Sequence, residues 1–173
     1  MILTPNPAQT LQADRLRFPG MLPREVLIFK NWLREHEREY DRIEFNCRVG
    51  PGHDPGPNWP DNLRLMAIAN SQKRIDACAW QGNLVTLIEV KDRAGASALG
   101  QLLTYYPLWN KEHSGLPPAQ LLMVTNRIQT GIDAATAFHG IRLDIVPTDF
   151  SILARDRQAS PFMAKQRDGV VNL

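Results

Sequence analysis

Apolar residues recur along the first half of the chain at two different spacings. In residues 23–40 they return every three to four positions, which predicts an amphipathic helix that begins at a proline and carries the apolar stripe Val26, Phe29, Leu33 and Tyr40. Residues 42–49 alternate polar and apolar, which predicts a strand, and a Gly- and Pro-rich loop follows from 50 to 60. Residues 62–70 fit neither period, so helix and strand both stay open there.

Two β-prone runs follow, at 74–80 and 84–91, separated by Gln81-Gly82-Asn83. Gly-Asn is a dipeptide that closes two-residue hairpins, so the two runs are expected to pair. Further along we expect a helix over 96–106, bent or interrupted by Pro107, a buried strand over 120–125, a helix over 131–139 and a strand over 141–146.

This order of elements indicates an α/β fold with a mixed sheet and helices on both of its faces, because strands alternate with helices after an antiparallel start. The helical and extended pattern spans residues 23–150, which we interpret as one domain. Residues 1–22 read as a proline-containing arm. Residues 151–173 read as a polar tail with Arg155, Arg157, Lys165 and Arg167.

Composition says more about the cellular location to expect than about the function. The 173 residues carry a net charge of +2, which permits a polyanionic partner without requiring one. Cys47 and Cys78 lack metal-ligand spacing, as do the four histidines, and two cysteines are too few for a disulfide framework. Without an apolar signal core or membrane span, we expect a cytoplasmic protein, or a virion-associated one if a phage encodes it.

The chemistry is concentrated in the hairpin. With Gly82 and Asn83 as its loop, paired residues have numbers that sum to 165, so Asp76 is expected opposite Glu89. Lys91 should share their face of the sheet, because side chains alternate along a strand. The other face should be apolar and packed under a helix; it comprises Ile75, Ala77, Ala79, Thr86, Ile88 and Val90.

Two carboxylates held side by side repel each other, and a divalent cation resolves that repulsion. Mg²⁺ prefers hard oxygen ligands and is typically held by one or two carboxylates with water and substrate phosphate, and we expect Mn²⁺ to substitute for it. A lysine at such a metal can orient the nucleophile or stabilise the charged transition state. Asp76, Glu89 and Lys91 therefore predict a site that hydrolyses phosphodiester bonds.

These residues resemble the PD-(D/E)XK nuclease superfamily: Asp76, then Ile88-Glu89-Val90-Lys91 on the adjacent strand, after an amphipathic helix. The motif part of the resemblance covers residues 74–105 and lacks the family's usual proline, which is replaced by Ile75. It implies a restriction-endonuclease-like core of order αβββαβαβ and a metal-dependent deoxyribonuclease. It also implies that the Val90 carbonyl adds a ligand beside Asp76 and Glu89.

Two further features resemble particular branches of that superfamily. Gln101-x-x-x-Tyr105 is similar to the extra Gln-Tyr motif of RecB-like members, and its spacing places both side chains on one helical face; a purely structural helix face is the alternative. Family members often add an acid from the first helix. Glu25, in a context similar to Holliday-junction resolvases, is our candidate for this metal ligand. The alternative is that Glu25 is a solvated acid in the first turn of the helix, where the helix dipole favours it. Glu35 and Glu44 are its rivals.

The expected partner is DNA, in repair, recombination or a phage context, with no membrane association and with assembly as a homo-oligomer or within a larger complex. The alternative function is a structural or assembly protein, such as a phage head-completion or neck component, that uses the same fold to dock on a nucleoprotein machine.

Overall fold

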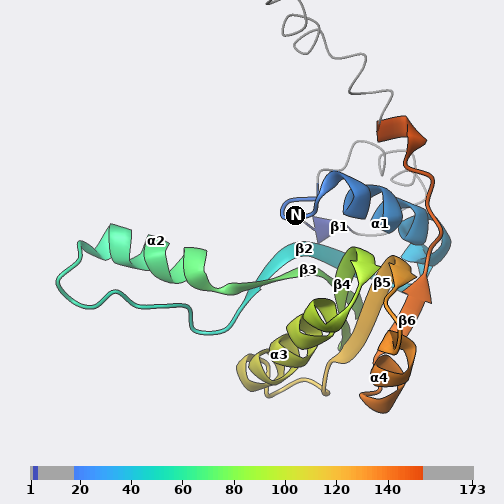
Figure 1. The fold of residues 1–173 in the computed structure, drawn as a ribbon. Coiled ribbons are helices and arrows are strands. Elements are labelled where there is room, and N and C mark those ends of the chain that lie inside the picture. Colours follow the sequence, from blue (N-terminus) through green and yellow to red (C-terminus); the bar gives the residue numbers. More distant parts are fainter. Residues whose placement is uncertain (1, 4–17, 154–173) are drawn as a thin grey trace, which may run out of the picture.

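The computed structural model describes residues 2–3 and 18–153 of the chain. Its centre is one six-stranded sheet in which the strands lie in the order of the sequence (Figure 1). Neighbours from the first strand to the fourth are antiparallel, and the last three strands run parallel, so the sheet is mixed. The strands are β1 (Ile2–Leu3), β2 (Arg42–Val49), β3 (Lys73–Gln81), β4 (Leu84–Ala94), β5 (Gln120–Ile128) and β6 (Arg142–Ile145).

Helices cover both faces of this sheet. Helix α1 (Pro23–His36), followed by the 3-10 turn η2 (Glu37–Glu39), lies on one face, and α3 (Ala96–Glu112) with α4 (Ile132–Phe138) lies on the other. The predicted order αβββαβαβ and the mixed sheet are confirmed. The structure adds β1 at the sheet edge and α2 (Asp61–Ser71) between β2 and β3.

The α1 face is closed by an apolar cluster. Phe29, Trp32 and Leu33 of the helix are fully buried against Ala77, Ala79, Ile88 and Val90 of the hairpin and against Leu122 and Val124 of β5. Phe18, from the predicted arm, packs into the same cluster, and its ring meets Phe29 and Phe45 edge-on. This packing fixes α1, and with it the first-turn residues that face the hairpin.

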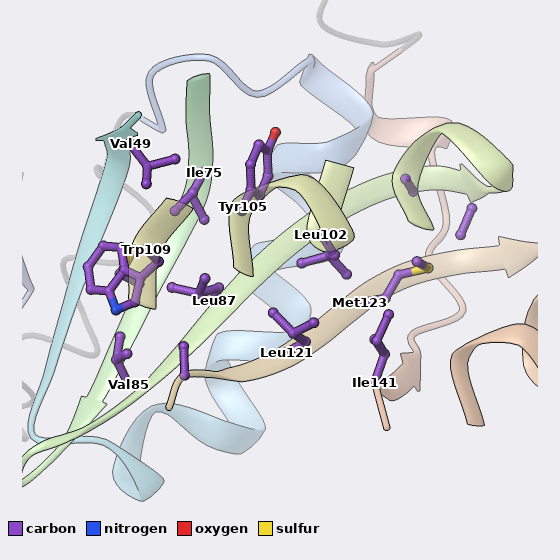
Figure 2. Packing of buried hydrophobic residues seen from close by; sticks show 14 of the residues in the cluster. Val49, Ile75, Val85, Leu87, Leu102, Tyr105, Trp109, Leu121, Met123 and Ile141 are labelled. Atoms are coloured by element: carbon purple, nitrogen blue, oxygen red, sulfur yellow. The ribbon is translucent and has the colours of Figure 1, made fainter. Parts of the chain in front are cut away.

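The opposite cluster holds α3 against the sheet. Leu102, Tyr105 and Trp109 of the helix pack with the sheet residues Val49, Ile75, Cys78, Val85, Leu87, Leu121 and Met123 (Figure 2). The ring of Tyr105 packs within this cluster while its hydroxyl points out of it. Trp109 is buried beyond Pro107, and α3 continues without interruption through the proline to Glu112, close to the expected limit at His113.

Two other elements differ from their expected form. The open segment 62–70 is helical, as α2, and it projects away from the sheet with no buried residue (Figure 1). The first helix ends at His36 and finishes in the 3-10 turn, short of the expected residue 40. In both cases the sequence period is weak, because few of the residues concerned contact the core.

The hairpin has the expected register. Five consecutive pairs, from Gln81 with Leu84 to Ala77 with Ile88, obey the predicted sum. Gly82 has a φ of +59°, which suits the first position of the two-residue turns that match the twist of a hairpin. A two-residue turn therefore sets which residues of β3 and β4 lie opposite each other.

One residue of the hairpin lies on the other face from the one expected. Ala77, Ala79, Ile88 and Val90 pack under α1 as predicted, but Ile75 belongs to the α3 cluster. The cause lies in β2, where Asn46 adopts a φ of +55° and is missing, with Asp76, from an otherwise continuous register. A left-handed residue breaks the alternation of a strand, so side chains beyond it change face.

The predicted C-terminal tail, from residue 154 on, lies outside the described residues, as does most of the arm before Phe18. Within the described part, no helix has the length and apolar character needed to span a bilayer.

Candidate active site

Asp76 lies where β3 and β4 stop pairing. The ladder between the two strands ends at Ala77 and Ile88, and the next backbone N–H of β4 that faces β3, that of Val90, donates instead to Oδ2 of Asp76 at 2.9 Å. In an antiparallel pair the N–H and C=O of one residue face the same neighbour, so the Val90 carbonyl faces this side too. The opening of the ladder thus brings a carboxylate and a main-chain oxygen together.

Glu89 and Lys91 come from β4 and are in contact. The Lys91 ammonium lies 2.6 Å from Oε1 of Glu89, and the Glu89 carboxylate is almost completely buried. The Lys91 ammonium is the charged partner of Glu89, and no backbone N–H of the described residues donates to this carboxylate. A buried carboxylate normally has such donors, and their lack is costly in a folded protein.

Glu25 reaches the same lysine from α1. Its Oε2 accepts a hydrogen bond at 2.8 Å from the N–H of Leu22, which is the return half of a capping box at the start of the helix. Its other oxygen, Oε1, lies 3.7 Å from the Lys91 ammonium, and the side chain is buried. Glu25 therefore caps the helix and also faces the site, so the two alternatives for this residue are compatible.

The pKa values of the two buried acids move in the direction expected for such crowding. Burial raises the pKa of Glu89 to about 8, with a further contribution from the negative charge of Asp76, against the opposing effect of Lys91. Burial also raises the pKa of Asp76 to about 6, while the hydrogen bond from Val90 opposes the change. The charge of Asp76 thus acts on Glu89, although the paired register ends one residue before the expected Asp76–Glu89 pair, at Ala77 and Ile88.

Gln101 and Tyr105 lie beside this group on α3. The Gln101 amide donates to the Tyr105 hydroxyl at 3.1 Å. Burial, and after it the charge of Glu89, raises the pKa of Tyr105, so the hydroxyl is within electrostatic reach of that carboxylate. Both side chains line a surface hollow of about 360 Å³ with Lys73, Ser97, Gly100 and Thr104.

The rivals of Glu25 lie elsewhere. Glu44 pairs with Arg42 at 3.1 Å, and Glu35 lines a separate hollow next to Val146. Over residues 2–3 and 18–153, no three His, Cys, Asp or Glu side chains converge into a preformed metal centre. The structure places Lys91 among three acids, Asp76, Glu89 and Glu25.

Two supporting features were not expected. Thr125, fully buried at the point where β5 passes Lys91, has its hydroxyl 2.8 Å from the carbonyls of both Lys91 and Arg127, and it accepts a hydrogen bond from the N–H of Ala94. It fixes the backbone that carries the lysine. The signal in the sequence was a threonine at the end of an apolar strand. The second feature is Asp92, which accepts hydrogen bonds from Arg24 and Asn126.

Comparisons with known proteins give two distant structural likenesses. No family model matches the sequence, and no curated protein matches it at a significant level. A repair endonuclease from Pyrococcus abyssi is 14% identical with a TM-score of 0.42, over 69% of this chain and 46% of that one. A protein of unknown function is 13% identical with a TM-score of 0.43, over 85% of this chain and 72% of that one.

The chain thus spans less than half the length of the repair endonuclease. Both likenesses are too distant to assign a function, so the function has to be inferred from the site itself.

Proposed function

We propose that this protein is a metal-dependent nuclease that hydrolyses DNA phosphodiester bonds with Asp76, Glu89 and Lys91. The observation that carries the proposal is the Glu89 carboxylate, which is 1% exposed, shares its position with the negative charge of Asp76 and has the Lys91 ammonium as its charged partner at 2.6 Å. Protein acids used only for structure are normally given donors or left in water. Two buried acids with raised pKa values that share one lysine suit a bound cation.

The donor set fits Mg²⁺ or Mn²⁺. Asp76 and Glu89 offer hard carboxylate oxygens, the Val90 carbonyl faces the same opening, and Glu25 is the remaining acid within reach of Lys91. When bound, such an ion lowers the pKa of a water molecule and neutralises charge on phosphate. The absence of a preformed three-acid centre is consistent with a magnesium site, which keeps several water ligands.

The protein groups have separate roles in this proposal. Val90 holds Asp76 in place through its N–H, and Thr125 holds the backbone at Lys91. The Lys91 ammonium has three donors, of which its contact with Glu89 engages one, and the side chain is 27% exposed, so a phosphate oxygen can approach the others. Gln101 and Tyr105 are positioning residues next to Glu89.

The test is cleavage by the purified full chain of linear, circular, single-stranded and branched DNA, with Mg²⁺, Mn²⁺ or EDTA. We expect metal-dependent cutting of at least one substrate. Asp76→Asn, Glu89→Gln and Lys91→Ala should each lower the rate about 100-fold or more, because each removes a charged group that acts on the reacting phosphate. Glu35→Gln, an exposed acid on α1, is the matched control.

A second readout does not depend on activity. Saturating Mg²⁺ should raise the melting temperature of the wild type, since a ligand at about 100 times its Kd stabilises by about 2.7 kcal/mol. Glu89→Gln and Asp76→Asn should lose most of that rise. Wild-type rates from Glu89→Gln, or an unchanged thermal response to Mg²⁺ in that variant, would remove the site.

The assembly role remains the alternative to this proposal. It predicts stable co-purification with a multisubunit particle and little cleavage by the free chain, and it predicts that Glu89→Gln assembles normally. An active, monodisperse free chain would count against it.

A further inference from the structure

Three arginines gather immediately beside the site and take no part in the chemistry proposed above. Arg24 is in the first turn of α1, Arg93 is near the end of β4, and Arg127 is its Cα partner in β5. Arg24 and Arg127 both approach Oδ2 of Asp92, at 2.8 and 3.9 Å. We call these three side chains the arginine cluster.

The cluster adjoins the site along two elements. Asp92, which joins two of its members, follows Lys91 directly in β4, and Arg24 precedes Glu25 directly in α1. Since a strand rises about 3.3 Å per residue, Arg93 starts about 6.6 Å beyond Lys91 along the same strand. That step is comparable to the separation of neighbouring phosphates in one nucleic-acid strand.

The charge of the cluster is not balanced locally. Asp92 accepts hydrogen bonds from Arg24 and Asn126 and lies 3.9 Å from Arg127. One negative charge thus serves two guanidinium groups, and Arg93, the next residue in β4, adds a third positive charge. Arg93 is exposed and has no hydrogen-bond or ion-pair partner among the described residues, and the Arg24 and Arg127 side chains are 54% and 60% exposed.

A structural role accounts for only part of this arrangement. The hydrogen bond from Arg24 to Asp92 ties α1 to β4, and a single arginine is enough for that. Arg127 is too far from Asp92 to add a directed hydrogen bond, and Arg93, its Cα partner, has no acid partner among the described residues. Like charges on directly opposed positions of neighbouring strands are destabilising, so this exposed pair favours an anionic partner.

We propose that the arginine cluster binds the phosphates of the DNA strand next to the one that is cut, and so sets the path of the backbone across the site. The substrate assignment rests on the proposed nuclease function. Guanidinium groups suit this task because they bind phosphate oxygens in pairs and stay charged at all relevant pH values. Contacts of this kind give affinity and register but do not read sequence.

The experiment compares two double variants of the full chain with equal loss of charge. Arg93→Gln with Arg127→Gln removes two members of the cluster and leaves the Arg24–Asp92 bond intact. Arg38→Gln with Lys111→Gln is the control. Both residues are exposed and far along their helices from the first turns that flank the site: Arg38 is in the 3-10 turn after α1, and Lys111 is in the last turn of α3. Circular dichroism checks that both variants fold.

Binding is measured by fluorescence anisotropy on labelled duplex DNA in EDTA, over a range of salt concentrations. The Arg93/Arg127 variant should bind at least about tenfold more weakly, and its plot of log K against log salt should lose a slope of about 0.9 for each phosphate contact removed. The control should keep the wild-type slope. Equal losses in the two variants, or none in the first, would overturn the proposal, as would a wild type that binds no DNA.

The two proposals fail separately. If Glu89→Gln abolishes cutting but the Arg93/Arg127 variant binds and cuts like the wild type, the nuclease stands and the cluster does not. If DNA binding depends on the cluster but no substrate is cut with any metal, the cluster stands and the catalytic proposal does not. An RNA duplex of the same sequence runs in parallel, and tighter cluster-dependent binding to RNA would overturn the choice of DNA.

Discussion

Acidic side chains lie beside basic ones near both ends of α1, but the two groups of acids differ in their burial and in their partners. At the C-terminal end Asp144 accepts hydrogen bonds from Trp32 and Arg142, and a hydrogen bond from His36 lowers the pKa of Glu39. At the N-terminal end, burial raises the pKa of Glu89 to about 8. The acids at the C-terminal end of α1 have hydrogen-bond donors or water around them. Glu89, at the N-terminal end, is buried with the Lys91 ammonium as its charged partner.

This contrast separates a structural ion network from a candidate active site better than a count of charges does. Glu39 is 47% exposed and Arg142 46%, so water screens their interaction, whereas Glu89 is 1% exposed. Exposed ion pairs contribute little to stability, while a buried acid without donors is costly unless something else occupies its surroundings. The proposed metal ion would lower the energetic cost of burying the Glu89 charge.

The largest expected effect comes from removing the cation at each end. At pH 10 in EDTA, where Glu89 beside its lysine is ionised, Lys91→Met should lower the free energy of unfolding by about 3 kcal/mol, because the carboxyl group must then bind a proton or stay buried and charged without a partner. Arg142→Met should cost at most about 1 kcal/mol, since its acids stay hydrated. Urea denaturation of both variants measures the difference. Equal losses would mean that the two ends are alike after all.

The hairpin shows how much of this contrast is written in the sequence. The two-residue Gly82-Asn83 loop fixes the register, and the register alone brings Asp76 towards Glu89 and keeps Lys91 next to it. These are local consequences of pairing and alternation. They were predictable because a one-residue slip would turn every apolar residue of the hairpin away from the core.

The features that were missed depend on contacts between distant segments. The left-handed Asn46, which accompanies the change of face at Ile75, lies inside the predicted strand, four residues before the turn signal at Gly50, although asparagine is a residue type that tolerates this conformation. The hold of Val90 on Asp76 exists only because the ladder opens there. The approach of Glu25 to Lys91 depends on how α1 packs, which no local pattern determines.

The next effect is on the pH dependence of stability in EDTA. The folded-state pKa of Glu89, about 8, lies above its ordinary value of 4.5, so between those values the folded chain binds more protons than the unfolded one. Stability should therefore be greatest at the acid end of this window and fall as pH rises to about 8, by up to about 1.4 kcal/mol per pH unit for one proton. Asp76 adds the same sign below pH 6.

Glu89→Gln should flatten this decline, because the amide does not titrate, and it should make the chain more stable than the wild type at pH 8. Glu35→Gln, the exposed control, should leave the slope unchanged. Thermal or urea unfolding at pH 5, 6.5 and 8 gives the comparison. A wild type that gains stability steadily from pH 5 to pH 8 would show that Glu89 is ionised at neutral pH, like the hydrogen-bonded acids at the C-terminal end of α1.

The smallest expected effect concerns the neutral neighbour of Glu89. Tyr105→Phe removes a buried hydroxyl that accepts a hydrogen bond from Gln101, which should cost about 1 kcal/mol of stability. It also removes a polar group within reach of the Glu89 charge, so the pKa of Glu89 should rise further. The acid limb of the rate–pH profile should then move to higher pH, with a rate loss below about tenfold at neutral pH.

Tyr106→Phe is the matched control, because this residue is next in the chain, is 38% exposed and lines a different hollow beside Gln120 and Arg142. It should leave both the rate and the profile unchanged. A purely structural Tyr105 would give the stability loss without moving the acid limb. That outcome would restrict the proposed site to the acids and Lys91. Gln101 and Tyr105 would then belong only to the face of α3 that packs on the sheet.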